Sequence, residues 1–205
     1  MIVRLVGSEM CIRDSLLNTD IPKNVFVSWS LNPQIFIDNE EHGTASLQER
    51  LNSAKKLSDK GVLVGFHFHP IVYYEGYEDD YKNIVKKVMS MFHPSQVAMI
   101  SMGTLTFIKP AINKLRSTGL KSKVLQIPME DAVGKSSYTK EVKKEIFSNV
   151  YDEFRSWHKD LFFYLCMEES SIWEMVFGDY YKSNTDFETA LFESVSLKMD
   201  ALQVA

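Results

Sequence analysis

The sequence predicts an α/β protein with a parallel sheet, because segments typical of strands alternate with segments typical of helices along most of its 205 residues. The strand-like segments are rich in β-branched and aromatic residues, and amphipathic segments with apolar residues three and four apart follow them. No hairpin signal joins consecutive strands, so each connection passes through a helix and the strands run parallel. This order leaves open a doubly wound sheet or a barrel.

The elements can be placed in chain order. Residues 24–31, NVFVSWSL, are expected to form a strand, and the long polar segment 32–45 a loop. Ser46 and Glu49 then form a capping box that begins a helix, which Gly61 ends. The expected later strands are 62–69, 96–102 and 161–166, and the expected helices are 78–92, 109–118, 141–157 and 171–177. Segment 103–107 is expected to be a loop, and 123–138 a short strand with a polar loop.

Composition narrows the class of protein. Hydrophobic residues make up 45% of the chain and charged residues 24%, which is typical of a globular domain. The net charge of −4 argues against a basic surface over the whole chain, although it allows a local basic groove. No apolar run approaches the roughly 18 residues that span a bilayer, so we expect no membrane partner. Two cysteines exclude a disulfide scaffold and favour the cytoplasm.

Three regions are expected along the chain. Residues 1–15 contain VGSEMCIRDS, which resembles translated sequencing-adapter read-through; a disordered native leader is the alternative, and Cys11 has no evolved role in the first case. Residues 16–178 are expected to form one domain, and residues 179–205 a helical or frayed tail.

Two histidines give the sharpest local signal. His67 and His69 lie at the end of the buried strand 62–69 and share one of its faces, because side chains alternate along a strand. The carboxyl ends of strands are where open α/β sheets bind ligands. Three interpretations remain open: ligands of zinc or another divalent ion in a barrel hydrolase, a buried pair bonded within the sheet, or a polar wall that faces a bound ligand.

Other candidate groups carry weaker signals. Tyr73, Tyr74 and Tyr77 are typical either of a surface that stacks on a nucleoside or of an ordinary strand-to-helix turn. Cys166 ends a strand, but a structural cysteine is commoner there than a nucleophile. The GKSSY loop at 134–138 lacks the spacing of a phosphate-binding loop, and no GxGxxG follows a strand.

Several stretches together resemble the spore photoproduct lyase family of radical S-adenosylmethionine enzymes. They follow in the family's order from about residue 24 to 178 and are SLNP (30–33), EHGTASLQER (41–50), GFHFHPIVYYEGYEDDY (65–81), ISMGTLTF (100–107) and YLCMEES (164–170). The resemblance implies the C-terminal half of a partial (β/α)6 TIM-like barrel. It also implies S-adenosylmethionine and a [4Fe–4S] cluster as cofactors, a 5′-deoxyadenosyl radical, and repair of ultraviolet-induced thymine lesions in DNA. An electron donor such as flavodoxin or ferredoxin is the implied redox partner.

The resemblance also implies roles for individual residues. The positions expected to bind S-adenosylmethionine are Ser30, Asn32, His67 and His69. The positions expected to lie near the substrate are Tyr73, Tyr74, Lys135 and Tyr138.

One departure from the family is decisive for activity. The family binds its cluster through CxxxCxxC, and this chain has no such motif, so we expect no metal ligands here. We therefore expect a C-terminal portion that is inactive alone. The alternatives are a metal-dependent barrel hydrolase that uses His67 and His69, and a non-catalytic nucleoside-binding module.

Overall fold

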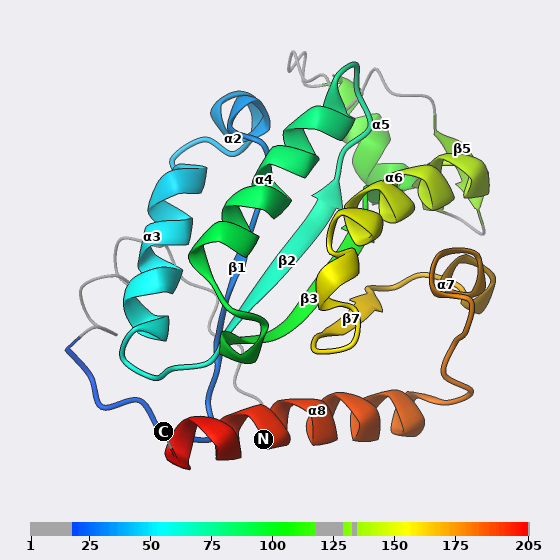
Figure 1. The fold of residues 1–205 in the computed structure, drawn as a ribbon. Helices are drawn as coiled ribbons and strands as arrows, with labels where there is room; N and C mark the ends of the chain where they lie inside the picture. The colour runs from blue at the N-terminus through cyan, green and yellow to red at the C-terminus, as the bar shows by residue number, and fades with distance from the viewer. Residues whose placement is uncertain (1–17, 118–128, 133–134, 205) are drawn as a thin grey trace.

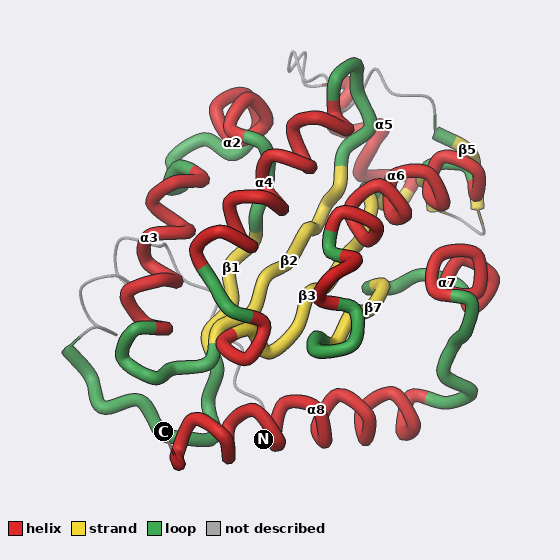
Figure 2. The backbone as a smooth tube through the Cα atoms, viewed as in Figure 1, coloured by secondary structure: helices red, strands yellow, loops and turns green. Residues whose placement is uncertain are grey.

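A four-stranded parallel sheet forms the centre of the computed structural model, which describes residues 18–117, 129–132 and 135–204. Its strands stand in the order β1 (Val27–Ser30), β2 (Val64–Ile71), β3 (Val97–Thr104) and β7 (Phe162–Leu165). All three neighbouring pairs are parallel, which confirms the predicted fold class. Figure 2 shows the loops after β1 and β2 at the same end of this sheet.

Three helices cover one face of the sheet. They are α3 (Leu47–Ser58), α4 (Tyr77–Met91) and α6 (Lys140–Glu153), and Figure 1 shows them in front of the strands. Alternate residues of β2, Phe66 and Phe68, are fully buried in the core beneath these helices. The capping box predicted at the start of α3 is present, with the Ser46 side chain accepting from the Glu49 N–H.

A long helix packs against the opposite face. Helix α8 (Asn184–Val204) runs past the amino ends of the strands, at the foot of Figure 1. Its Val195 is buried in a second apolar cluster with Leu63, Ala98 and Met99. The Lys198 ammonium of α8 donates to the carbonyls that precede and begin β3, at 2.9 Å from Pro94 O and 2.7 Å from Val97 O. This helix therefore closes the amino end of the sheet's second face.

Two parts of the predicted element order are wrong. The expected loop 103–107 contributes β4 (Thr106–Ile108), which forms an antiparallel sheet with β6 (Lys135–Ser137) and β5 (Glu130–Ala132). Each of these strands has three residues, too few to show an alternating pattern. The expected loop 32–45 contains α2 (Gln34–Glu40), a one-sided helix with a single buried residue, Ile37.

Helices α5 (Lys109–Ser117) and α7 (Ser170–Phe177) agree with the expected order. Two short 3-10 turns were not expected: Pro94–Gln96 precedes β3, and Arg155–Trp157 replaces the last turn of the expected helix 141–157. In the part of the chain that the structure describes, no helix combines the length and apolar character needed to cross a bilayer. The expected foreign or disordered segment 1–15 lies outside the described residues.

Candidate functional site

The face of the sheet that turns away from α3, α4 and α6 is polar toward the carboxyl ends of the strands. Ser28 and Ser30 on β1 share this face with His67 and His69 on β2, because Ser30 pairs with His67 in the parallel register. His67 pairs in turn with Ser101 on β3. We call these five residues the polar floor. The structure thus brings two predicted residues, Ser30 and His67, onto neighbouring positions.

Burial differs across the polar floor. His67 is only 6% exposed, and its Nε2 lies 2.9 Å from Ser28 Oγ. Ser101 is fully buried, and among the described residues its hydroxyl has no hydrogen-bond partner. An unsatisfied buried hydroxyl costs about 1–3 kcal/mol, so Ser101 is an uncompensated polar group in the middle of the sheet. Ser30, by contrast, is exposed at the end of β1, so its hydroxyl is accessible to a ligand.

His69 is fixed by its neighbour on β3. A Cβ added to Gly103 would lie 2.9 Å from three atoms of the His69 ring, so the ring lies directly over this glycine. On the far side of β3, Cys166 continues β7, and its N–H donates to Met102 O at 2.7 Å. The absence of a side chain at Gly103 is therefore what lets the imidazole lie flat on the sheet.

A buried ionic group holds the loop that follows β1. Asn32 is 1% exposed, and its Nδ2 donates to Glu41 Oε1 at 2.6 Å. Arg50 donates to Glu41 Oε2 at 2.7 Å and to the Ser30 carbonyl at 3.1 Å. The hydroxyl of the buried Tyr81 donates to Asn32 Oδ1 at 3.2 Å. The Asn32 amide thus bonds to protein groups on both sides and fixes the segment that carries Ser30.

The predicted tyrosines gather at the carboxyl end of β2. Tyr138 is 4% exposed, and its hydroxyl accepts the Tyr73 N–H at 3.1 Å. Tyr74 and Tyr77 donate to Asp80 and Glu145, each at 2.7 Å.

Tyr74, Tyr77 and Tyr138 stay protonated in the folded chain. Burial is the main cause that raises the pKa of Tyr74 and of Tyr77, followed by the bonds to their carboxylates. Burial raises the pKa of Tyr138 to about 12. The structure therefore brings Tyr74 and Tyr138, as neutral hydrogen-bonding groups, to the strand end that carries Tyr73. Lys135 lies on β6, and its side chain is outside the described residues.

A second buried ion pair, which the sequence did not single out, lies at the carboxyl end of β7. Glu168 accepts from Lys143 of α6 at 2.7 Å and from the Thr104 hydroxyl at 2.8 Å. The side chain of Glu168 is 3% exposed and that of Lys143 15%. The preceding residue, Met167, has φ of 59°, which is uncommon outside glycine and asparagine and costs energy that the clamped Glu168 offsets. The only sequence signal was the acidic YLCMEES stretch.

The described residues do not assemble a metal centre. Within them, no group of three or more His, Cys, Asp or Glu side chains lies close enough to hold an ion. Cys166 is the one cysteine in this part of the chain, and three thiolates cannot come from a chain with two cysteines. The residues present therefore do not fit a [4Fe–4S] cluster, and they do not support the metal-hydrolase interpretation of His67 and His69.

The fold and the candidate site together define an α/β protein with a parallel sheet and a polar face at the carboxyl ends of its strands. A sequence model of the family described as spore photoproduct lyase matches residues 3–156. The chain belongs to the spore photoproduct lyase family.

Curated relatives carry the same name. The spore photoproduct lyase of Clostridium acetobutylicum is 27% identical over 118 residues, which cover 55% of this chain and 32% of that protein. The spore photoproduct lyase of Bacillus subtilis is 32% identical over 75 residues, 37% of this chain and 22% of that protein. The matched region thus spans about a third or less of these relatives' length.

Solved structures share the fold. A spore photoproduct lyase complexed with dinucleoside spore photoproduct matches with a TM-score of 0.63 at 22% identity. The match covers 78% of this chain and 49% of the chain in that structure. A double mutant of the enzyme with bound S-adenosylmethionine and dinucleoside spore photoproduct has a TM-score of 0.64, also at 22% identity. The chain corresponds to about half of each structure, in agreement with the expected half of a barrel.

Proposed function

We propose that this chain is part of a radical S-adenosylmethionine enzyme that repairs ultraviolet-induced thymine lesions in DNA, and that its polar floor binds S-adenosylmethionine. The observation that carries the proposal is the exposed Ser30 hydroxyl at the carboxyl end of β1, where Ser30 pairs with His67 on the polar face in a chain of this family. The cofactor offers ribose hydroxyls, an amino group and a carboxylate, all of which bond to serine and imidazole groups.

The proposed roles follow from exposure. Ser30 is the exposed hydroxyl of the floor and would contact the cofactor directly. His67 and His69 would line the cofactor from below, while Asn32 would position Ser30 through the loop after β1. Tyr73, Tyr74, Lys135 and Tyr138 would form the side from which the DNA lesion approaches.

The cluster chemistry needs groups from elsewhere. The cysteines of this chain cannot supply three thiolates, so the [4Fe–4S] cluster, and with it catalysis, requires a further part of the protein. Flavodoxin or ferredoxin as electron donor and a cytoplasmic location belong to the same proposal. The 205-residue chain alone is proposed to bind and not to react.

Isothermal titration calorimetry of the chain with S-adenosylmethionine tests the proposal. We expect measurable binding, and Ser30→Ala should raise Kd about three- to tenfold, the range for one lost hydrogen bond. Ser90→Ala, which changes an exposed serine of α4, is the matched control and should leave Kd unchanged. No heat of binding at millimolar cofactor, or equal Kd values for the two variants, would contradict the proposal.

A further inference from the structure

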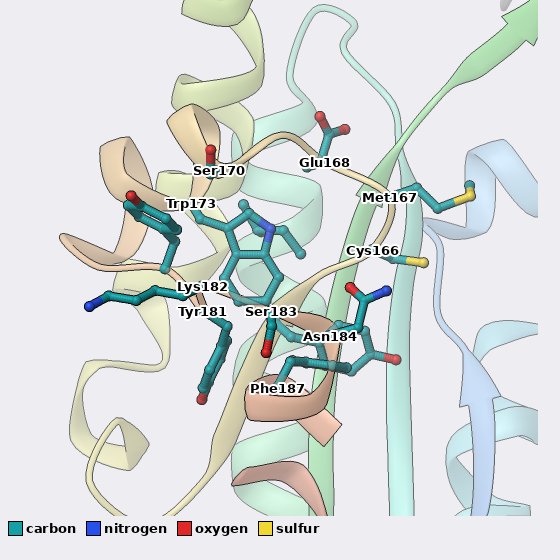
Figure 3. A pocket seen from close by; sticks show the side chains of 13 residues that line it. Cys166, Met167, Glu168, Ser170, Trp173, Tyr181, Lys182, Ser183, Asn184 and Phe187 are labelled. Carbon is teal, nitrogen blue, oxygen red and sulfur yellow. The ribbon is translucent and has the colours of Figure 1, made fainter. Parts of the chain in front are cut away.

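A cavity of about 400 Å³ lies beside the polar floor, between the end of β7, helix α7 and the start of α8. This volume is in the usual range for small-molecule sites. Figure 3 shows Trp173 in the middle of the lining residues, with Tyr181 and Phe187 on one side of it and Cys166 at the strand end. Neither the polar floor nor the tyrosines after β2 contribute to this cavity.

The cavity wall is aromatic. Trp173 meets Phe187 edge to face at 6.1 Å between ring centroids and meets Tyr181 at 5.8 Å. Tyr164 of β7 lies 5.3 Å from Phe187 in the same arrangement. Such a wall favours a planar ring, because aromatic side chains stack on nucleic-acid bases of any sequence.

Polar groups at the rim match the edge of a base. The Asn184 side chain is exposed and lines the cavity, and in Figure 3 its amide points toward Cys166. A carboxamide both donates and accepts, as does the imide edge of thymine. Lys182 also lines the cavity and supplies a cation for a phosphate. The one buried carboxylate of the lining, Glu168, is neutralised by Lys143 at 2.7 Å.

The cavity is contiguous with the polar floor. Tyr164 of its wall pairs with Ser101 on the adjacent strand, and Ser101 pairs with His67. Neighbouring strands lie about 4.8 Å apart, so His67 and Tyr164 are about 10 Å apart across the sheet. A base in the cavity would therefore lie within one nucleoside length of a molecule on the floor.

We propose that this aromatic cavity is a pyrimidine subsite that holds a base of the lesion-bearing DNA strand next to the cofactor. The proposal rests on the proposed function for the identity of the substrate. It assigns base binding to Trp173, Phe187 and Asn184, residues of the carboxyl-terminal part of the chain that the implied substrate positions do not include.

Titration of the 205-residue chain with dinucleoside spore photoproduct tests the subsite, with calorimetry for Kd and tryptophan fluorescence for location. The other two tryptophans, Trp29 and Trp157, are 3% and 7% exposed in the core, so a stacked base should quench Trp173. The quenching should be lost in Trp173→Phe. Asn184→Asp and Phe187→Leu should each raise Kd about five- to tenfold.

Matched controls are present in the chain. Asn52→Asp makes the same charge change on the exposed side of α3, and Phe192→Leu makes the same truncation at a side chain 64% exposed on α8. Both should leave Kd within about twofold. Wild-type chain that does not bind the dinucleoside, or cavity variants that bind it as well as the controls do, would overturn the proposal. Weaker binding of S-adenosylmethionine by the cavity variants would also overturn it, since the cavity would then hold the cofactor.

The same titrations separate this proposal from the previous one. Ser30→Ala should weaken the binding of S-adenosylmethionine and leave the binding of the dinucleoside unchanged. Asn184→Asp should weaken the binding of the dinucleoside and leave that of S-adenosylmethionine unchanged. Cofactor binding without dinucleoside binding refutes the subsite alone. Dinucleoside binding that depends on Asn184, in a chain that fails to bind the cofactor, supports the subsite and refutes the proposed function.

Discussion

Replacement of Arg50 by alanine should destabilise the chain far more than loss of a surface cation. The Arg50 side chain is 3% exposed and donates to Glu41 Oε2 at 2.7 Å, the Thr44 hydroxyl at 2.8 Å, Ala45 O at 2.9 Å and Ser30 O at 3.1 Å. Removing one partner of a fully buried pair costs about 3–5 kcal/mol, because the other charge stays buried. Glu41 is 22% exposed and keeps some water, so we expect a loss of about 2–4 kcal/mol.

Urea unfolding followed by circular dichroism measures this loss. With an m value of about 2 kcal/mol/M, the midpoint should fall by about 1–2 M. Lys82→Ala is the control, since Lys82 pairs with Glu153 at 2.7 Å but is 43% exposed, and it should cost under about 1 kcal/mol. If Arg50→Ala also cost less than 1 kcal/mol at unchanged m, the buried group would not hold the loop after β1.

Two further predictions concern the sheet and its covering helix. Gly103→Ala should lower the unfolding free energy by about 1–3 kcal/mol and displace the His69 ring. Gly65→Ala is the control and should lower it less, because the nearest neighbour of the added Cβ is the flexible end of Met99 at 3.0 Å. Equal losses of the two variants in urea unfolding would refute the packing argument. Burial lowers the pKa of Lys198 from 10.5 to about 8, so between these values the unfolded chain binds a proton that the folded chain lacks, and stability should rise with pH. Urea midpoints at about pH 7.5 and 9.5 should show the rise in the wild type and a flatter dependence in Lys198→Met, and a fall over this range would contradict it.

Most of the fold could be predicted because its strands and helices have strong periodicity. The strand 62–69 is mostly apolar and rich in β-formers, and the helix after Ser46 has both a capping box and an apolar stripe. The antiparallel sheet of β4, β5 and β6 could not be predicted, because pairing between three-residue strands depends on contacts from Thr106 to Ser137 that no local pattern contains.

The shared face of the candidate site could be predicted because its residues lie on strands. Alternation placed His67 and His69 on one face, and the resemblance added Ser30. Ser101 was missed because a serine within an apolar strand looks ordinary until its hydroxyl is found buried without a partner in the described part of the chain. The ion pair between Glu168 and Lys143 joins residues 25 positions apart, a separation at which sequence carries no spacing rule.

The buried ionic group around Arg50 has a consequence for how the family is recognised. The stretches SLNP and EHGTASLQER contribute Asn32, Glu41 and Arg50 to this group, and these side chains bond to one another and to the backbone. A change at one of them leaves a buried charge or amide of the others without a partner, so we expect the three to be retained together. Around the cavity at the end of β7, Glu168 is held in the same way by Lys143, but Asn184 is exposed and can change without leaving a buried group unpaired. The frame of the fold can therefore stay recognisable while the exposed residues of the proposed base subsite diverge.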